Sequence, residues 1–191
     1  MLRSRETLFA AAAPFSLVFV LVAGASAQTA KPDFTGSYVF VPKRSDDLKE
    51  AIGRAVGPDF TVGNKKSEQA RVWIKSWLES TTSDPDKRIL TIEHTATAFK
   101  SGMGDEVNNY YFGREATSEG PGGGSNKVTV TWRGDQIVTE EKQTKGKGQI
   151  TAIYTLVPDG KTLLVAWRLE HDSLLSPLEV RLAFERARAA Q

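Results

Sequence analysis

The chain has 191 residues, with 25 basic and 23 acidic side chains and a formal net charge of +2. Hydrophobic residues make up 40% of the chain and charged residues 25%, a globular composition that excludes general disorder. The absence of cysteine excludes disulfides, thiolate zinc sites and cysteine nucleophiles, and a charge so near balance argues against a nucleic-acid-binding surface.

The N-terminal segment is predicted to be a signal peptide over residues 1–27. Two arginines are followed by an apolar run that ends at Ala25-Ser26-Ala27, a small-residue site of the kind that signal peptidase accepts. The run is shorter than the roughly 20 apolar residues of a membrane span, which disfavours the alternative of an uncleaved anchor. We therefore expect an exported protein, periplasmic or secreted, whose residues 28–191 form one domain without stable membrane insertion.

The mature chain is predicted to open with one strand and two helices. Residues 35–41 are rich in aromatic and β-branched side chains, which favours a strand. Ser45 has the position of a helix N-cap, and the apolar residues that follow share one helical face. A second helix is predicted after Ser67, with Trp73 and Trp77 on its apolar face. That face either packs on the core or docks a protein partner.

From residue 89 onward the apolar pattern has a period of two. It predicts strands at 89–92, 97–100, 107–112, 127–132, 137–139, 150–156, 163–169 and 178–184. The glycine-rich residues 119–126 are predicted to be a flexible loop. No helix-length segment separates these strands, so an antiparallel meander is favoured, and closure into a barrel would remove its exposed edges.

Short motifs in this chain resemble those of exported bacterial lipocalin-like proteins of the calycin type. The opening F-x-G-x-W and later serine of those proteins correspond here to Phe34, Gly36, Tyr38 and Ser45. Later matches have the sequences FGRE, WRGDQIV and LVPDGKTL, at 112–115, 132–138 and 156–163. The resemblance covers most of the mature chain. It implies a mainly β fold, a meander closed into a lipocalin or fatty-acid-binding-like barrel, with two short helices between the first and second strands.

Two departures from this resemblance bear on the ligand. Tyr38 stands in place of the tryptophan at the closed end of the barrel. Arg181 lies one residue out of register with the R-x-Y motif of the last strand in fatty-acid-binding proteins, which turns it to the other face of the strand. Capture of a ligand carboxylate by that arginine is therefore not implied.

The interior of the predicted barrel is the candidate ligand site. Small barrels are either filled by side chains or hold one small ligand. The candidate lining residues are the large apolar side chains on the inward faces of the strands: Tyr38, Phe40, Phe99, Val130, Trp132, Tyr154, Trp167, Leu182 and Phe184. The same side chains would form an ordinary core in a filled barrel, and both interpretations stay open.

No arrangement of residues predicts a catalytic site, a cofactor or a metal. His94 and His171 have no spacing that would bring them together as ligands. Ser125 lacks the G-x-S-x-G turn of a nucleophilic serine, and the adjacent Glu140 and Glu141 face opposite ways in a strand.

The leading hypothesis is an exported carrier of a small hydrophobic ligand that is not an enzyme and binds no nucleic acid. One alternative is an envelope interaction module with a filled core, which docks a protein partner through the helix that carries Trp73 and Trp77. The other is a barrel lyase or isomerase, which needs a polar group inside the barrel, with His94 and Tyr154 as the candidates.

Overall fold

A computed structural model of the protein describes residues 31–56, 89–103, 106–120, 124–144, 148–172 and 174–187. These residues belong to one compact unit, Lys31–Gln191. The predicted signal peptide and the predicted second helix, with Trp73 and Trp77, lie outside the described residues. None of the helices in the described ranges has the length and apolar character that crossing a membrane requires.

Strands dominate the described residues, as the period-two pattern predicts. The chain begins with strand β1 (Gly36–Phe40), the short 3₁₀ helix η1 (Pro42–Arg44) and helix α1 (Leu48–Val56). Nine further strands follow: β2 (Ile89–His94), β3 (Ala98–Met103), β4 (Glu106–Tyr111), β5 (Glu115–Gly120), β6 (Gly124–Arg133), β7 (Gln136–Gln143), β8 (Gln149–Leu156), β9 (Thr162–Glu170) and β10 (Leu178–Arg186).

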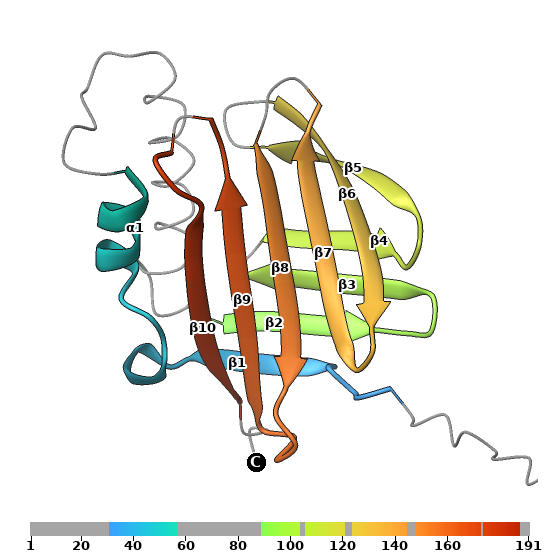
Figure 1. Ribbon diagram of the computed structural model, residues 1–191. Helices are drawn as coiled ribbons and strands as arrows, with labels where there is room; N and C mark the ends of the chain where they lie inside the picture. The colour runs from blue at the N-terminus through green and yellow to red at the C-terminus, as the bar shows by residue number, and fades with distance from the viewer. Residues whose placement is uncertain are drawn as a thin grey trace, which may run out of the picture. The chain divides into compact units, whose positions relative to one another are not determined.

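Helix α1 forms where the first helix is predicted, but its N-cap is Asp47 rather than Ser45. The Asp47 carboxylate accepts a hydrogen bond of 3.0 Å from the backbone N–H of Glu50. Ser45 instead ties the chain to β10, since its hydroxyl accepts a bond of 2.9 Å from the backbone N–H of Ala183. The helix lies beside β10 (Figure 1) and buries Ala55. The expected pair of helices is not confirmed, because the described residues hold one α-helix and a 3₁₀ turn.

The ten strands form one antiparallel sheet that follows the order of the chain. Its order is β4-β3-β2-β1-β10-β9-β8-β7-β6-β5, so the pairing of β1 with β10 brings the first and last strands together. Between β4 and β5 there is no ladder of hydrogen bonds. A single bridge between Phe112 and Val130 spans this interval, where the backbone N–H of Gly113 donates to the Val130 carbonyl at 2.9 Å. The sheet is therefore a nearly closed barrel.

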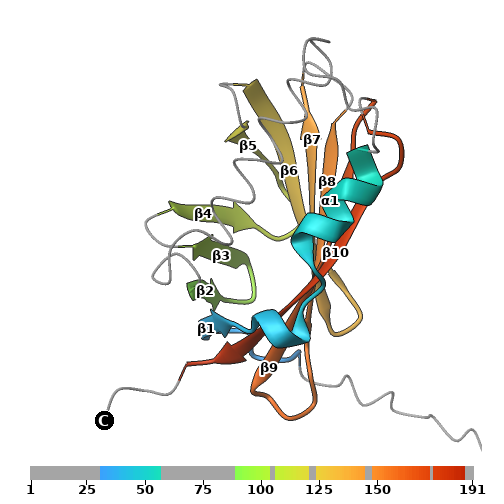
Figure 2. The ribbon, with the colours of Figure 1, turned by 90° about the vertical axis from the view of Figure 1, so that its left-hand side faces the viewer.

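The barrel is flattened into two layers. In Figure 1, strands β1–β4 lie behind strands β7–β10 and run across them. The view turned by 90° separates the two groups (Figure 2). The inward side chains of both layers make up the buried core, whose largest members include Tyr38, Phe99, Phe184 and Ile92. The predicted mainly β barrel is thus confirmed.

One end of the barrel is closed by Tyr38 and Arg186. Tyr38 is fully buried, and its hydroxyl donates to the carbonyl of Phe34 at 2.9 Å. The Arg186 guanidinium lies over the tyrosine ring, 5.2 Å from its centroid, and also donates to the tyrosine hydroxyl at 2.9 Å. Two further bonds, to the carbonyls of Asp33 and Thr35, join the last strand to the chain that precedes β1.

Aromatic rings fill the same end. The Trp132 ring lies 5.9 Å from the ring of Phe34, 5.8 Å from that of His94 and 5.4 Å from that of Phe112, with which it stacks. Together with Tyr38 and Arg186, these four residues are called the filled end below. Aromatic groups bury large apolar areas, so this packing stabilises the region where β1, β2 and β6 come together.

The prediction of a flexible loop over 119–126 is wrong for most of that range. Strand β5 continues to Gly120 and β6 begins at Gly124, with Glu119 opposite Ser125 in the register. The side chains of β5 are mostly polar, so its sequence shows little of the alternation that marks the other strands. Its extended conformation comes from pairing with β6, a tertiary interaction that local pattern does not display.

Candidate ligand-binding site

A cavity of about 160 Å³ lies inside the barrel, away from the filled end. Its walls come from the inward faces of β2, β3, β4, β6, β7, β8 and β9. They comprise Leu90, Ser101, Gly102, Met103, Asn108, Tyr110, Val128, Thr139, Glu141, Ile150, Ala152, Tyr154 and Trp167. Asn108 lines the cavity and is also exposed, so the cavity communicates with solvent on the β4 side.

Small side chains are the reason that this region is hollow. Ala152 stands in the middle of β8, where its neighbours on the same face are Ile150 and Tyr154. Across the barrel, Ser101 and Gly102 of β3 contribute little volume. Protein interiors are otherwise close-packed, so the small side chains of Ala152 and Ser101 on facing walls leave space that their neighbours do not fill.

The hairpin between β6 and β7 determines which polar groups enter the cavity. Its tight turn pairs Trp132 with Ile137, and the register then places Glu141 opposite Val128. Successive side chains in a strand alternate between faces, so Glu141 shares the inward face with Val128, whereas Glu140 faces outward. The expectation that the two glutamates face opposite ways is confirmed, and one of them lines the cavity.

The Glu141 carboxylate is held in place by two neighbouring side chains. Its Oε1 atom accepts a hydrogen bond of 2.5 Å from Nδ2 of Asn126 and one of 3.1 Å from the hydroxyl of Ser118. Asn126 is fully buried, and its own oxygen Oδ1 has no hydrogen-bond partner in the described part of the chain. These contacts fix the orientation of a negative charge at the wall of the cavity.

Two tyrosine hydroxyls complete the polar part of the site. Burial raises the pKa of Tyr154 to about 12, although the hydroxyls of Ser101 and Thr139 beside it lower that pKa in part. Burial also raises the pKa of Tyr110 to about 12. The charge of Glu141, which lines the same cavity, raises both pKa values further. Both tyrosines are therefore neutral hydroxyl groups at any physiological pH.

Two of the nine candidate lining residues, Tyr154 and Trp167, line this cavity. The other seven lie in or against the packed core. Phe99 packs on Tyr154 at 5.4 Å and Phe40 packs on Phe184 at 5.6 Å between ring centroids. The fully or almost fully buried members are Tyr38, Phe99, Val130, Leu182 and Phe184, while Phe40 and Trp132 are partly buried against them. Whether any of the nine contacts a ligand stays a prediction.

The histidine proposed for a barrel enzyme lies in the filled end. The Nε2 atom of His94 accepts a hydrogen bond of 3.0 Å from the backbone N–H of Phe34 and lies 3.3 Å from the carboxylate of Asp33. It is not among the residues that line the cavity with Tyr154. In the described ranges no group of three or more His, Asp and Glu side chains could hold a metal ion.

Arg168 and Arg181, unlike Arg186, face away from the interior. Arg181 is exposed on β10, as its register with the sequence motif predicts. Arg168 of β9 is also exposed and forms ion pairs with Glu170 and Glu179. Neither guanidinium lines the cavity, and no lysine or arginine appears among the described residues that do.

Sequence reasoning missed Ser101, Tyr110, Thr139 and Glu141 as lining residues. The signal that could have found Glu141 is the turn at Arg133-Gly134-Asp135, because a hairpin with a two-residue turn fixes the register of both strands. Counting outward from that turn pairs position 137 with 132 and position 141 with 128. The same count pairs Thr139 with Val130, so the hairpin also turns Thr139 inward. Ser101 and Tyr110 come from β3 and β4, whose position opposite this hairpin depends on how the barrel is flattened.

Comparisons with known proteins identify the fold. No model of a protein family matches the sequence, and no curated protein matches it. The solved structures that match include a secretary abundant heat soluble (SAHS) protein from Ramazzottius varieornatus, with a TM-score of 0.53 and 13% identity over 84% of this chain and 98% of that one. They also include the REP1-NXSQ fatty acid transporter, with a TM-score of 0.50 and 12% identity over 82% and 97%.

A third match is lipid binding protein 8 of Caenorhabditis elegans, with a TM-score of 0.49 and 14% identity over 81% of this chain and 95% of that one. At such identities the likeness is one of fold. The chain shares its barrel fold with the heat soluble protein and the fatty acid transporter, and the content of its barrel has to be argued from its own side chains.

Proposed function

We propose that this protein is a carrier that holds one small, largely apolar molecule inside its barrel and performs no covalent chemistry on it. The observation that carries the proposal is the cavity of about 160 Å³. Its walls combine apolar side chains with convergent polar groups in about equal measure, and convergent polar groups in a concave pocket are typical of small-molecule sites. The similar fold of a fatty acid transporter is compatible with this role.

The volume of the cavity favours a compact ligand. Pockets for drug-sized molecules measure about 300–1,000 Å³, whereas an apolar cavity of about 150 Å³ binds benzene. The buried part of the ligand is therefore about as large as one ring or a short alkyl chain. A longer tail would have to leave through the side where Asn108 is exposed.

Filling the cavity tests the proposal. Isothermal titration calorimetry of the full chain with hexanol, cyclohexanol and benzyl alcohol should show saturable binding of at least one of them. In the variant Ala152→Phe the new ring occupies the space between Ile150 and Tyr154, and binding should be lost. The matched control is Ala166→Phe, which adds the same ring on β9 at a position where the side chain faces away from the interior.

Two results would overturn the carrier proposal. One is that none of the three alcohols binds at millimolar concentration and that native mass spectrometry finds no small molecule with the purified chain. The other is that Ala152→Phe binds as the unmodified chain does. Circular dichroism of both variants, at the same temperature, identifies a loss of binding that is due to unfolding.

We also propose that the protein acts outside the cytoplasm. The support is the pattern of residues 1–27, with its basic start, apolar run and small-residue site. Expression of the full chain in a bacterial host, followed by N-terminal sequencing of the soluble exported product, should give a chain that begins at Gln28. A product that retains residues 1–27 would overturn this proposal.

A further inference from the structure

We propose that the cavity selects a ligand whose head group is a cation that donates hydrogen bonds, an ammonium on a short apolar body, and that Glu141 is its counter-ion. This inference rests on the proposed carrier function, because it names the class of molecule carried. It is the reverse of a site that captures a carboxylate with an arginine.

The position of Glu141 is the first support. The register of β6 and β7 turns this side chain inward, and it is the acidic residue among the described lining residues. Asn126 and Ser118 both donate to its Oε1 atom, so the carboxylate is oriented before any ligand arrives. Preorganised charge of this kind attracts an opposite charge at little reorganisation cost.

The surroundings of the carboxylate are the second support. The phenols of Tyr110 and Tyr154 stay protonated, as the rise of both pKa values to about 12 indicates, and therefore add no charge of their own. Their oxygens can accept hydrogen bonds from an ammonium group, and the aromatic rings of the lining, which include Trp167, favour a cation over an anion. A ligand carboxylate would instead face the like charge of Glu141, which disfavours its binding.

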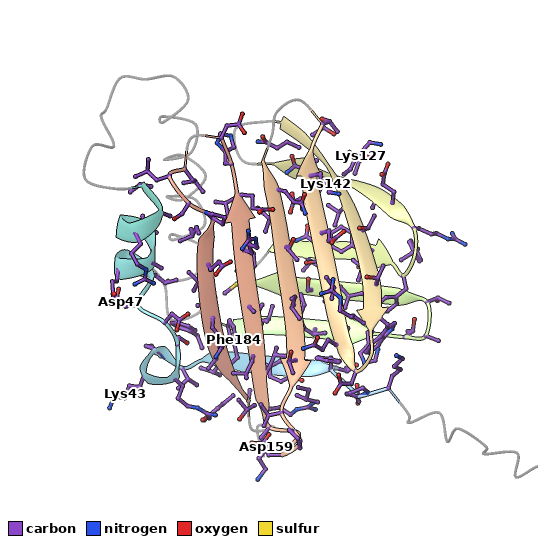
Figure 3. All side chains as sticks on the ribbon, viewed as in Figure 1. Lys43, Asp47, Lys127, Lys142, Asp159 and Phe184 are labelled. Carbon is purple, nitrogen blue, oxygen red and sulfur yellow. The ribbon has the colours of Figure 1, made fainter. Side chains whose placement is uncertain are left out.

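The basic side chains nearest to Glu141 in the sequence do not reverse the negative charge of the cavity. Lys142, next to Glu141 on β7, and Lys127, its partner on β6, are both exposed near one end of these strands (Figure 3). Lys127 pairs with Glu115 at 2.8 Å, and Lys100 of β3 pairs with Glu93 at 3.0 Å. Successive side chains of a strand alternate between its two faces, so Lys127 and Lys142, each next to an inward residue, lie on the outer face of the barrel.

Three ligands with one tail and different heads test the inference. Hexylamine, hexanol and hexanoate at pH 7.5 present a cation, a neutral hydroxyl and an anion on the same alkyl chain. Calorimetry of the full chain should give the order amine, alcohol, acid, with hexylamine at least tenfold tighter than hexanoate. If none of the three binds, the carrier proposal itself fails. If hexanol binds and hexylamine is no tighter than hexanoate, only the present inference fails.

The variant Glu141→Gln assigns the preference to one residue. The amide keeps an oxygen that can accept from Asn126 and Ser118, so the wall keeps its shape while the charge is removed. Hexylamine affinity should fall at least tenfold and by a larger factor than hexanol affinity, and the difference between amine and acid should close. The control is Glu140→Gln, the same change on the adjacent outward residue, which should alter none of the three affinities.

Two further outcomes contradict the assignment. Unchanged hexylamine affinity in Glu141→Gln would exclude Glu141 as the counter-ion. An equal loss of hexylamine affinity in Glu140→Gln would show that the loss comes from the net charge of the protein and not from the position of Glu141. If Glu141→Gln does not fold, the order of affinities in the unmodified chain still decides whether the cavity prefers a cation.

Discussion

The filled end and the cavity are built from the same alternating strands, yet one is packed solid and the other is hollow. In the filled end, the interior holds the rings of Phe34, Tyr38 and Trp132, and Arg186 of the last strand covers the Tyr38 ring. At the cavity, corresponding inward positions carry Ser101 and Ala152. Alternation along a strand therefore determines which side chains point inward, whereas the volume of those side chains determines whether the interior is filled. Stability and binding should respond to substitutions at opposite ends of the barrel.

The largest expected effect is on stability, from Phe34→Ala in the filled end. The ring is fully buried between His94 and Trp132 and leaves a cavity when it is removed. The free energy of unfolding should fall by about 3–5 kcal/mol, the usual cost of deleting a buried phenylalanine ring. Urea denaturation measures this loss. Hexanol affinity of the folded variant should stay within twofold, and a large change in it would contradict the separation of the two regions.

The next effect comes from Arg186→Met, which keeps most of the apolar stem and removes the guanidinium. Three hydrogen bonds are lost, to the carbonyls of Asp33 and Thr35 and to the Tyr38 hydroxyl. We expect a loss of about 2–3 kcal/mol in the free energy of unfolding, from about 1 kcal/mol for each bond. Thermal and urea denaturation provide the measurement, and an unchanged stability would show that the tyrosine ring closes this end alone.

High pH should weaken the fold through the tyrosines of the cavity. Tyr110 and Tyr154 have a pKa of about 12 in the folded chain, against an ordinary value of 10.0. Between pH 10 and 12 the unfolded chain loses protons that the folded chain keeps, so the free energy of unfolding falls as the pH rises. For Tyr154 the loss is on the order of 2 kcal/mol. Denaturation at pH 9.5 and 11.5 should show a smaller difference in Tyr154→Phe than in the unmodified chain.

The smallest expected effect is that of Thr139→Val, which changes one cavity-lining hydroxyl to a methyl group. The Thr139 hydroxyl lowers the pKa of Tyr154, so its removal should raise that pKa further. The free energy of unfolding should fall by only about 1 kcal/mol. Ultraviolet titration of tyrosinate absorbance, compared with the same titration of Tyr154→Phe, identifies the shifted group. A fall in that pKa would contradict the arrangement of the two hydroxyls.

Sequence patterns predicted the barrel and helix α1, because those elements depend on local periodicity. The alternation at Leu178, Val180, Leu182 and Phe184 places the inward face of β10 correctly. Strand β5 was not predicted, since its polar side chains acquire extended structure only by pairing with β6. Propensity is a weak guide wherever tertiary pairing determines the conformation.

The candidate site was predicted only in part, for a different reason. Periodicity assigns Phe99 and Tyr154 to the inward face, but it does not distinguish the filled part of a barrel from the hollow part. Apolar alternation within single strands assigns the lining to apolar residues alone, so it does not identify Glu141. The register of the β6–β7 hairpin, which the sequence does encode, supplies the missing information.

The interval between β4 and β5 has a consequence for the speed of ligand exchange. Among the described strands, every other neighbouring pair is joined by a ladder, whereas here one bridge at Phe112 and Val130 spans the wall. Separating β4 from β6 would break the bond between Gly113 and Val130 and the stacking of Phe112 on Trp132, and would leave the nine ladders intact. A guest molecule could then enter and leave on the timescale of local opening, many times during the lifetime of one folded barrel.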